Sequence, residues 1–299
     1  MNLSRRGFLN LCKSSSVAIG LSALDVIKIG ELLADPNAPT VLWLQGSGCS
    51  GCSVSFLNYI APSAPATAAE VLISKVNLAF HQTVMDVSGP SAVGTVDSAY
   101  TKGNYVLVVE GGVPTAFNGY TCMAWTKDGR DVTFKEAVTT LASRASKILC
   151  IGTCASWGGV SAALPNPSGV RGVKAITGKT TVNIAGCPPH PNWIVWGIAN
   201  ALLNSVGSLD SYGRPTGLFN RTVHDQCPRH EREEARTYGQ DGYCLEELGC
   251  LGPKCRAACP ASGWNNGANW CVDANTLCIG CTEPTFPVAQ LRGAGERDD

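Results

Sequence analysis

Residues 41–52 have the sequence VLWLQGSGCSGC, in which a short apolar run passes directly into a glycine-rich turn with two cysteines. An apolar run of this length, bounded by glycine, is typical of a strand buried in a parallel sheet. The turn places Cys49 and Cys52 at the carboxyl end of that strand, which is where open α/β sheets bind their ligands. The segment therefore predicts an α/β fold with a ligand site at the strand ends.

The same alternation continues along the chain. β-rich apolar runs are separated by segments compatible with helices, which predicts a parallel α/β sheet. The expected strands are residues 41–44, 76–80, 105–109, 147–151 and 181–184, and the expected helices include residues 53–59, 134–143 and 191–203. Two later strands lead into glycine-containing turns with further cysteines, Cys154 and Cys187. Because glycine allows the backbone to approach a bulky inorganic group, we expect these turns to form one shared site.

Composition limits the classes of function. The chain has 299 residues, of which 44% are hydrophobic and 15% charged, with 23 basic and 23 acidic side chains. That balance argues against nucleic-acid binding, which needs a basic excess or a basic patch. The 15 cysteines are an odd number, in a chain long enough to fold without disulfide staples. Metal binding therefore explains them better than disulfides do.

The distribution of these features predicts two domains after a leader. Residues 207–217 (GSLDSYGRPTG) are a turn-rich break between an α/β domain at 35–206 and a C-terminal domain at 207–299. In the C-terminal part the apolar periodicity fails, while eight cysteines lie within residues 218–299. We expect such a segment to be ordered by metal rather than by an apolar core.

The leader is expected at residues 1–34. The segment SRRGFL at residues 4–9, followed by a weakly apolar stretch at 17–24, is typical of a twin-arginine export signal. That route carries proteins already folded around their cofactors, so the expected location is the periplasm. No apolar run approaches the 18 residues or more of a membrane span, which leaves association with a membrane only through another subunit.

Three groups of soft ligands can be proposed from the cysteine spacing. The first comprises the strand-end residues Cys49, Cys52, Cys154 and Cys187. Four thiolates suit a cubane iron–sulfur cluster or zinc, and one short pair with two distant single cysteines favours the cluster.

The second group has one imidazole and three thiolates: His224, Cys227, Cys244 and Cys250. Because imidazole is neutral, a cluster bound there should be easier to reduce than one with four thiolates. The alternative is that His224 has a surface or capping role. Its cysteine neighbours favour the ligand role over that alternative.

The third group comprises Cys259, Cys271, Cys278 and Cys281. Cys255 is an alternative ligand in place of Cys259. We prefer Cys259 because proline follows it. The cysteines left without a ligand role are Cys12 in the leader, Cys122, Cys150 and Cys255. Of these, Cys150 lies within an apolar run and is interpreted as a small buried hydrophobe.

Seven motifs resemble those of the small subunit of the nickel–iron hydrogenases, in the order in which that family has them. They are GSGCSGC at 46–52, HQTVM at 81–85, VEGGVPT at 109–115, GTCASWGG at 152–159, GCPPHP at 186–191, GYCLEELGCLGP at 242–253 and CIGCTEP at 278–284. The resemblance covers nearly the whole chain. It implies a flavodoxin-like domain followed by a small, irregular cluster-binding domain.

The resemblance also implies three clusters and a partner. The first group would hold a proximal 4Fe–4S cluster, the second a distal 4Fe–4S cluster and the third a medial cluster. Electrons would pass from the nickel–iron site of a large subunit to a multihaem cytochrome c or a membrane cytochrome. Since the family's nickel ligands lie in the large subunit, this chain is not expected to split hydrogen alone.

One residue departs from the pattern of most members. Cys271 stands where they have proline beside a three-iron medial cluster, so a third 4Fe–4S cluster is expected here, with a 3Fe–4S cluster as the alternative. This feature makes the chain most similar to the nickel–iron–selenium branch, whose selenium lies in the large subunit. A packing role beside Trp270 is the other explanation of Cys271. The rival functions are a stand-alone ferredoxin-like carrier, the related cluster subunit of respiratory complex I, and a zinc-stabilised structural protein.

Overall fold

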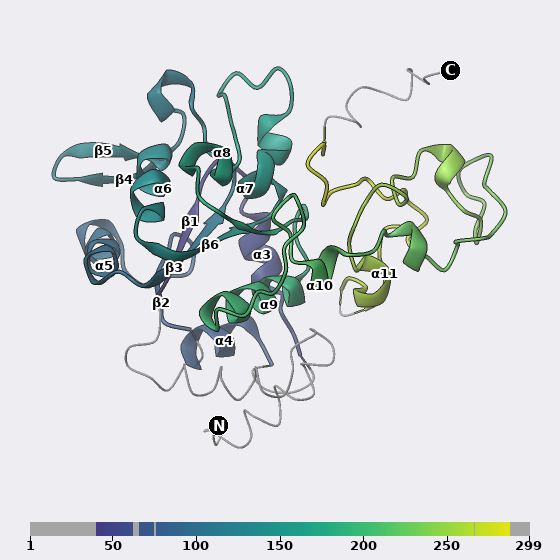
Figure 1. The fold of residues 1–299 in the computed structure, drawn as a ribbon, viewed down its shortest axis with the longest axis horizontal. Helices are drawn as coiled ribbons and strands as arrows, with labels where there is room; N and C mark the ends of the chain where they lie inside the picture. The colour runs from purple at the N-terminus through teal and green to yellow at the C-terminus, as the bar shows by residue number, and fades with distance from the viewer. Residues whose placement is uncertain (1–39, 62–65, 75, 266, 288–299) are drawn as a thin grey trace.

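A computed structural model describes residues 40–61, 66–74, 76–265 and 267–287 (Figure 1). The expected export signal at residues 1–34 lies outside the described residues. None of the helices within the described ranges is both long and apolar enough to cross a bilayer.

A parallel sheet of five strands forms the centre of the molecule. Its strands are β1 (Thr40–Gln45), β2 (Leu78–His81), β3 (Tyr105–Glu110), β6 (Ala145–Ile151) and β7 (Val182–Ile184). They lie in the order β2-β1-β3-β6-β7, and all neighbouring pairs are parallel. This is the flavodoxin-like strand order, so the predicted fold class and all five predicted strands are confirmed.

Helices cover both faces of the sheet (Figure 1). One face carries α5 (Gly89–Lys102), α6 (Phe134–Ala142) and α8 (Val173–Thr177), and the other carries α3 (Gly51–Leu57), α4 (Ala68–Ser74) and α9 (Pro191–Leu202). Strand residues alternate between these faces, as the two-residue period of a strand requires. Thus Trp43 packs in the cluster of buried side chains that contains Phe56 of α3, whereas Leu42 packs in the one that contains Val138 of α6.

An antiparallel hairpin, β4 (Met123–Lys127) and β5 (Arg130–Thr133), was not predicted. Asp128 and Gly129 connect its strands, and both have positive φ, at 51° and 74°. An Asp-Gly pair between two short strands is a recognised hairpin signal, so the sequence did contain the information.

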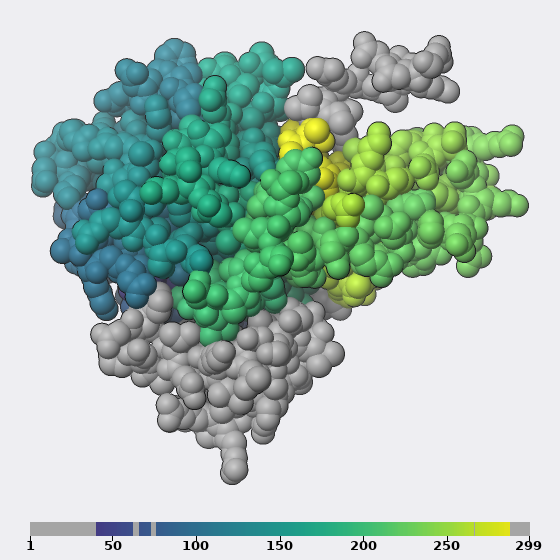
Figure 2. Space-filling model, viewed as in Figure 1, coloured from purple at the N-terminus to yellow at the C-terminus, as the bar shows by residue number. Residues whose placement is uncertain are grey.

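Residues 216–265 and 267–287 form a lobe beside the sheet, which we call the C-terminal lobe (Figures 1 and 2). Its elements are short: α10 (Thr216–Phe219), η3 (His224–Gln226), η4 (Glu246–Leu248) and α11 (Cys259–Ser262). Similar short elements, η1 (Ala116–Gly119), α7 (Thr153–Trp157) and η2 (Gly159–Ala162), follow β3 and β6. Phe219, Leu245 and Val272 of the lobe belong to the same cluster of buried apolar side chains as α3 and α9.

A buried arginine holds the start of the lobe to its end. The Arg214 side chain is 1% exposed, and its Nε atom lies 2.8 Å from Asp210 Oδ2. Its Nη1 atom lies 2.8 Å from Glu283 Oε1 and donates to the Thr282 carbonyl at 3.0 Å. The charge is therefore fully paired, which is the condition for burying it.

Candidate metal centres

The sheet brings the first predicted group of cysteines together. Cys49 and Cys52 lie at the start of α3 after β1, Cys154 lies in α7 after β6, and Cys187 follows β7. Burial raises the pKa of Cys52, and its three partner cysteines and Glu110 raise it further. The four sulfurs therefore lie close enough to repel one another's negative charge, as expected of ligands to one cationic centre.

Two glycines make room for these sulfurs. Gly152 has a φ of +90°, and a Cβ atom there would lie 2.5 Å from Cys52 Sγ. Gly159 has a φ of +51°, and a Cβ atom there would lie 2.9 Å from Cys154 Sγ. Any side chain at either position would enter the space that the thiolates occupy, so the turns fit a group bound at this place.

Glu110 is a functional residue that the sequence analysis missed. Its side chain is 3% exposed and accepts hydrogen bonds from the backbone N–H groups of Cys52 (3.1 Å) and Ser53 (3.0 Å). It also accepts from Trp43 Nε1 at 3.0 Å. The carboxylate thus fixes the start of α3 and, with it, the Cys52 sulfur. A charged residue that ends a wholly apolar strand was the signal that could have revealed this role.

His81 adjoins the same network. Its Nε2 atom lies 3.2 Å from the Ser53 hydroxyl, and its ring is fully buried. Burial lowers the pKa of His81 to about 4, against an opposing effect of Glu110. The ring is therefore neutral at pH 7, which keeps a second charge away from the first group of thiols.

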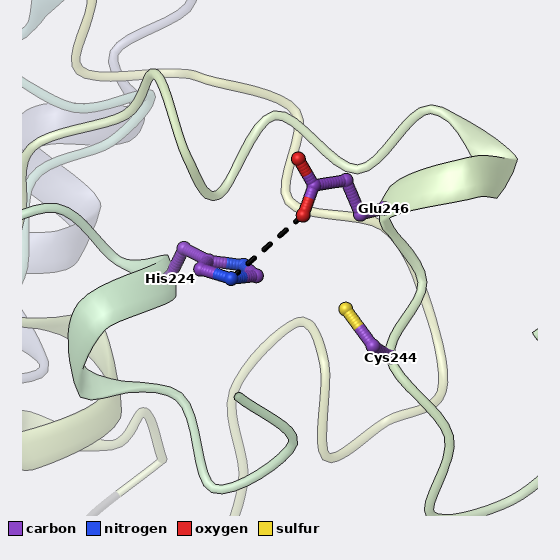
Figure 3. Close-up of side chains that lie close together, drawn as sticks. All are labelled: His224, Cys244 and Glu246. Carbon is purple, nitrogen blue, oxygen red and sulfur yellow. Dashed lines mark ion pairs between the residues drawn. The ribbon is translucent and has the colours of Figure 1, made fainter. Parts of the chain in front are cut away.

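The second predicted group also converges, within the C-terminal lobe. One donor atom each of His224, Cys244 and Glu246 lies within 4.8 Å of the others, and Figure 3 shows the ring and the carboxylate facing one another. Burial raises the pKa of Cys227, and the charges of Cys250 and Cys244 raise it further. All four predicted residues therefore lie together.

Glu246 was not predicted at this site. Its Oε2 atom lies 3.7 Å from His224 Nε2, and its side chain is 45% exposed. Thiolate and imidazole are the ligands of iron–sulfur clusters, whereas a carboxylate commonly accepts a hydrogen bond from the ring nitrogen that a bound metal leaves free. Glu246 is placed for that supporting role.

The third predicted group gathers where the lobe meets the sheet. Burial raises the pKa of Cys259 to about 12, and the charges of Cys255 and Cys271 add to it. Burial also raises the pKa of Cys281, as do Cys255, Cys259 and Cys271. Cys278 lies beside Cys255, and the hydrogen bond between the two thiols raises the pKa of Cys278.

Cys255 thus lies among the third group although it was given no ligand role. It is 1% exposed, and its sulfur lies 3.1 Å from the Thr282 hydroxyl in addition to its contact with Cys278. Five thiols are present where a cubane needs four, so the preference for Cys259 over Cys255 stays a prediction. Of the other unassigned cysteines, Cys150 is fully buried, as predicted, and Cys122 is partly buried against the same core.

The CIGC loop, residues 278–281, contacts both of the other groups. The backbone N–H of Cys278 donates to Cys250 Sγ at 3.3 Å. At the other end of the loop, the Cys281 carbonyl accepts a hydrogen bond from the Thr153 hydroxyl. The three groups therefore form a row, with the third in the middle.

Comparison with known proteins identifies the family. Residues 49–201 match the model described as NADH ubiquinone oxidoreductase, 20 Kd subunit, and residues 219–291 match the model of the C-terminal part of the NiFe/NiFeSe hydrogenase small subunit. The periplasmic NiFeSe hydrogenase small subunit of Desulfomicrobium baculatum is 38% identical over 312 residues, covering 96% of this chain and 97% of that one. This chain belongs to the NiFe/NiFeSe hydrogenase small-subunit family.

Other members of the family agree with this. The periplasmic NiFe hydrogenase small subunit of Solidesulfovibrio fructosivorans is 36% identical, covering 95% of this chain and 90% of that one. The structure of a recombinant NiFeSe hydrogenase from Desulfovibrio vulgaris Hildenborough is similar, with a TM-score of 0.77 and 37% identity over 85% of this chain and 96% of that one.

A hydrogenase small subunit is the electron-transfer partner of a large subunit, which carries the catalytic site. The stand-alone carrier and the complex I-type subunit are therefore set aside. The first family model alone would fit the latter, but the second model and the relatives of matching length identify a hydrogenase subunit.

Proposed function

We propose that this hydrogenase small subunit relays electrons through three iron–sulfur clusters, from the large subunit's Ni–Fe or Ni–Fe–Se site to a cytochrome outside the cytoplasm. The reaction served is H2 + oxidised acceptor = 2 H+ + reduced acceptor. The observation that carries the proposal is the row of three ligand groups joined by the loop at residues 278–281. Bound clusters would supply the one-electron redox centres.

The proposed ligand sets are those expected from the sequence. The proximal set is Cys49, Cys52, Cys154 and Cys187; the distal set is His224, Cys227, Cys244 and Cys250; and the medial set is Cys259, Cys271, Cys278 and Cys281. In the medial set Cys259 and Cys278 are buried and Cys271 is exposed, and in the proximal set Cys49 and Cys187 are exposed. An exposed proximal group is one that a partner can cover.

The large subunit is proposed to dock beside the proximal group. Val54 and Leu57 of α3 are 54% and 44% exposed, and Ile60 just beyond the helix is 57% exposed. Apolar side chains gathered next to Cys49 and Cys52 are the kind of surface that a partner protein buries.

Metal analysis of the complex with the large subunit tests the three-cluster proposal. Three cubanes require about 12 iron atoms and about 12 acid-labile sulfides in the small subunit. Zinc as the dominant metal, or iron for only one cubane, would contradict it.

Export is tested separately. We propose that the chain reaches the periplasm by the twin-arginine route, supported by the motif at residues 4–9 and by periplasmic relatives. Changing Arg5 and Arg6 to lysine should retain the chain and its partner in the cytoplasm, as measured by cell fractionation.

The electron acceptor is tested with the complex under hydrogen. Reduction of a purified multihaem cytochrome c, compared with reduction of a membrane fraction, distinguishes the two proposed acceptors.

A further inference from the structure

Thr153 lies at the junction between the proximal and medial ligands, although it is not itself a ligand. It directly precedes Cys154 and is 1% exposed. Its hydroxyl donates to the Cys281 carbonyl at 2.5 Å and accepts from the backbone N–H of Gly186 at 3.0 Å. A single buried side chain thus joins the turns of three ligands.

The backbone around Thr153 strengthens the same junction. Its own N–H donates to the Gly186 carbonyl at 3.0 Å, and the Gly152 N–H donates to the Ile184 carbonyl at 2.9 Å. The turn that contains Cys187 is therefore held to the turn of Cys154 from both sides.

This arrangement joins the turn of a proximal ligand to the loop of a medial ligand. Gly186 directly precedes Cys187 of the proximal set, and the carbonyl that accepts from Thr153 belongs to Cys281 of the medial set. Because the Thr153 hydroxyl bonds to both Gly186 and Cys281, it holds the two segments together.

We propose that Thr153 is a positioning residue for electron transfer: its hydroxyl sets the contact between the proximal and medial ligands, and thereby the separation of the two clusters. The proposal rests on the three-cluster function above. Electron transfer slows steeply with distance, so the same contact also sets the rate of the first step away from the large subunit.

Thr153→Val tests this in the complex with the large subunit, since valine keeps the volume and removes the hydroxyl. The magnetic interaction between the reduced proximal and medial clusters, measured by electron paramagnetic resonance, should weaken, because the two ligand segments are no longer joined by the hydroxyl. Hydrogen-dependent dye reduction should slow several-fold. Hydrogen–deuterium exchange of the gas should be unchanged, because it needs no electron to leave the large subunit.

Two variants serve as controls. Thr153→Ser keeps the hydroxyl and should retain the wild-type magnetic interaction. Thr181→Val makes the same change at another buried threonine, directly before β7 and so at the far end of that strand from Cys187, and should leave the interaction unchanged. Thr153→Ala, which is too small to clash, repeats the test if the valine variant fails to assemble.

The outcomes separate the two proposals. A wild-type magnetic interaction in Thr153→Val and Thr153→Ala, or an equal weakening in Thr153→Ser, would overturn the role of the hydroxyl. A wild-type subunit without a medial cluster would instead overturn the proposed function.

Discussion

The sheet domain and the C-terminal lobe differ in how much regular structure they have. All six residues of β3, in the sheet domain, are buried. The helices α10 and α11 of the lobe have only four residues each. The sheet domain carries alternating apolar side chains on both faces of every central strand and can be ordered by their burial alone. The lobe contributes few large apolar side chains, and most of its cysteines lie in the distal and medial groups. The comparison indicates that burial orders one region and that ligands and a few charged contacts order the other.

Removing the metal should give the largest difference between the two regions. In the iron-free chain, backbone amides of residues 219–287 should exchange with solvent faster by a factor on the order of 10² or more, because metal-binding energy becomes folding energy in such segments. Amides of β1, β3 and β6 should keep their protection. Hydrogen exchange with mass spectrometry measures both, and equal loss in the two regions would show that the sheet also depends on metal.

The loss of one medial ligand should have the next largest effect. Cys259→Ala should remove the medial cluster and lower the iron content by about four atoms because, unlike Cys271, Cys259 is one of the three thiolates that would hold even a three-iron cluster. Cys255→Ala should leave about 12 iron atoms, because its thiol is assigned to the hydrogen bond with Thr282. The reverse result would transfer the ligand role to Cys255.

Arg214 tests the charged contacts of the lobe. Arg214→Ala leaves Asp210 and Glu283 without their cation in a largely buried place and should lower the free energy of unfolding by about 3–5 kcal/mol. Arg130 pairs with Glu136 at the surface, with side chains 64% and 42% exposed, so Arg130→Ala should lower the free energy of unfolding far less than Arg214→Ala. Chemical denaturation of the two variants measures the difference.

The pH dependence tests His190, which links the two regions. Its Nδ1 atom accepts from the Asn192 N–H at 3.1 Å, and its ring packs against that of Trp264 in the lobe, with ring centroids 5.2 Å apart. Burial lowers the pKa of His190 from 6.5 to about 4. Between these pH values the unfolded chain binds a proton that the folded chain does not, so stability falls as pH falls, by about 3 kcal/mol in total.

His190→Gln should therefore be less sensitive to acid than the wild type between pH 6.5 and pH 4, with the same slope above pH 7. Calorimetry of the holo protein at several pH values gives the slopes. Because burial also lowers the pKa of His81 to about 4, the variant should keep about half of the wild-type slope. An unchanged slope would show that His190 is protonated in the folded chain.

The sequence predicted the sheet because its strands are short apolar runs with turn signals at both ends. It missed α5, whose buried face consists of small side chains such as Ala92 and Ala99 and gives only a weak periodic signal. The grouping of the cysteines was predictable because thiols that could share one metal centre stand at short spacings or at the ends of neighbouring strands. Glu110 and Thr153 were not assigned roles, because the hydrogen bonds that define them join segments far apart in the chain.

The smallest expected change concerns a single iron atom at Cys271. Trp270 and Val272 on either side are 4% and 3% exposed, so they fix the backbone while the Cys271 thiol reaches the medial group. A cubane corner without a protein ligand loses its iron readily. Cys271→Pro should therefore lower the iron content from about 12 to about 11 atoms and raise the medial potential, because cluster type and charge set the potential.

Electron paramagnetic resonance of the oxidised complex distinguishes the two medial clusters. An oxidised 4Fe–4S cluster of this kind is diamagnetic, whereas an oxidised 3Fe–4S cluster is paramagnetic. The Cys271→Pro variant should therefore gain a signal that the wild type lacks. Cys122→Ala, at a cysteine outside all three groups, should give the wild-type spectrum. The lobe should still fold in Cys271→Pro, since three thiolates remain at the site. A strong three-iron signal in the intact wild type would mean that Cys271 packs beside Trp270 without binding iron, and the medial cluster would then be held by three thiolates rather than four.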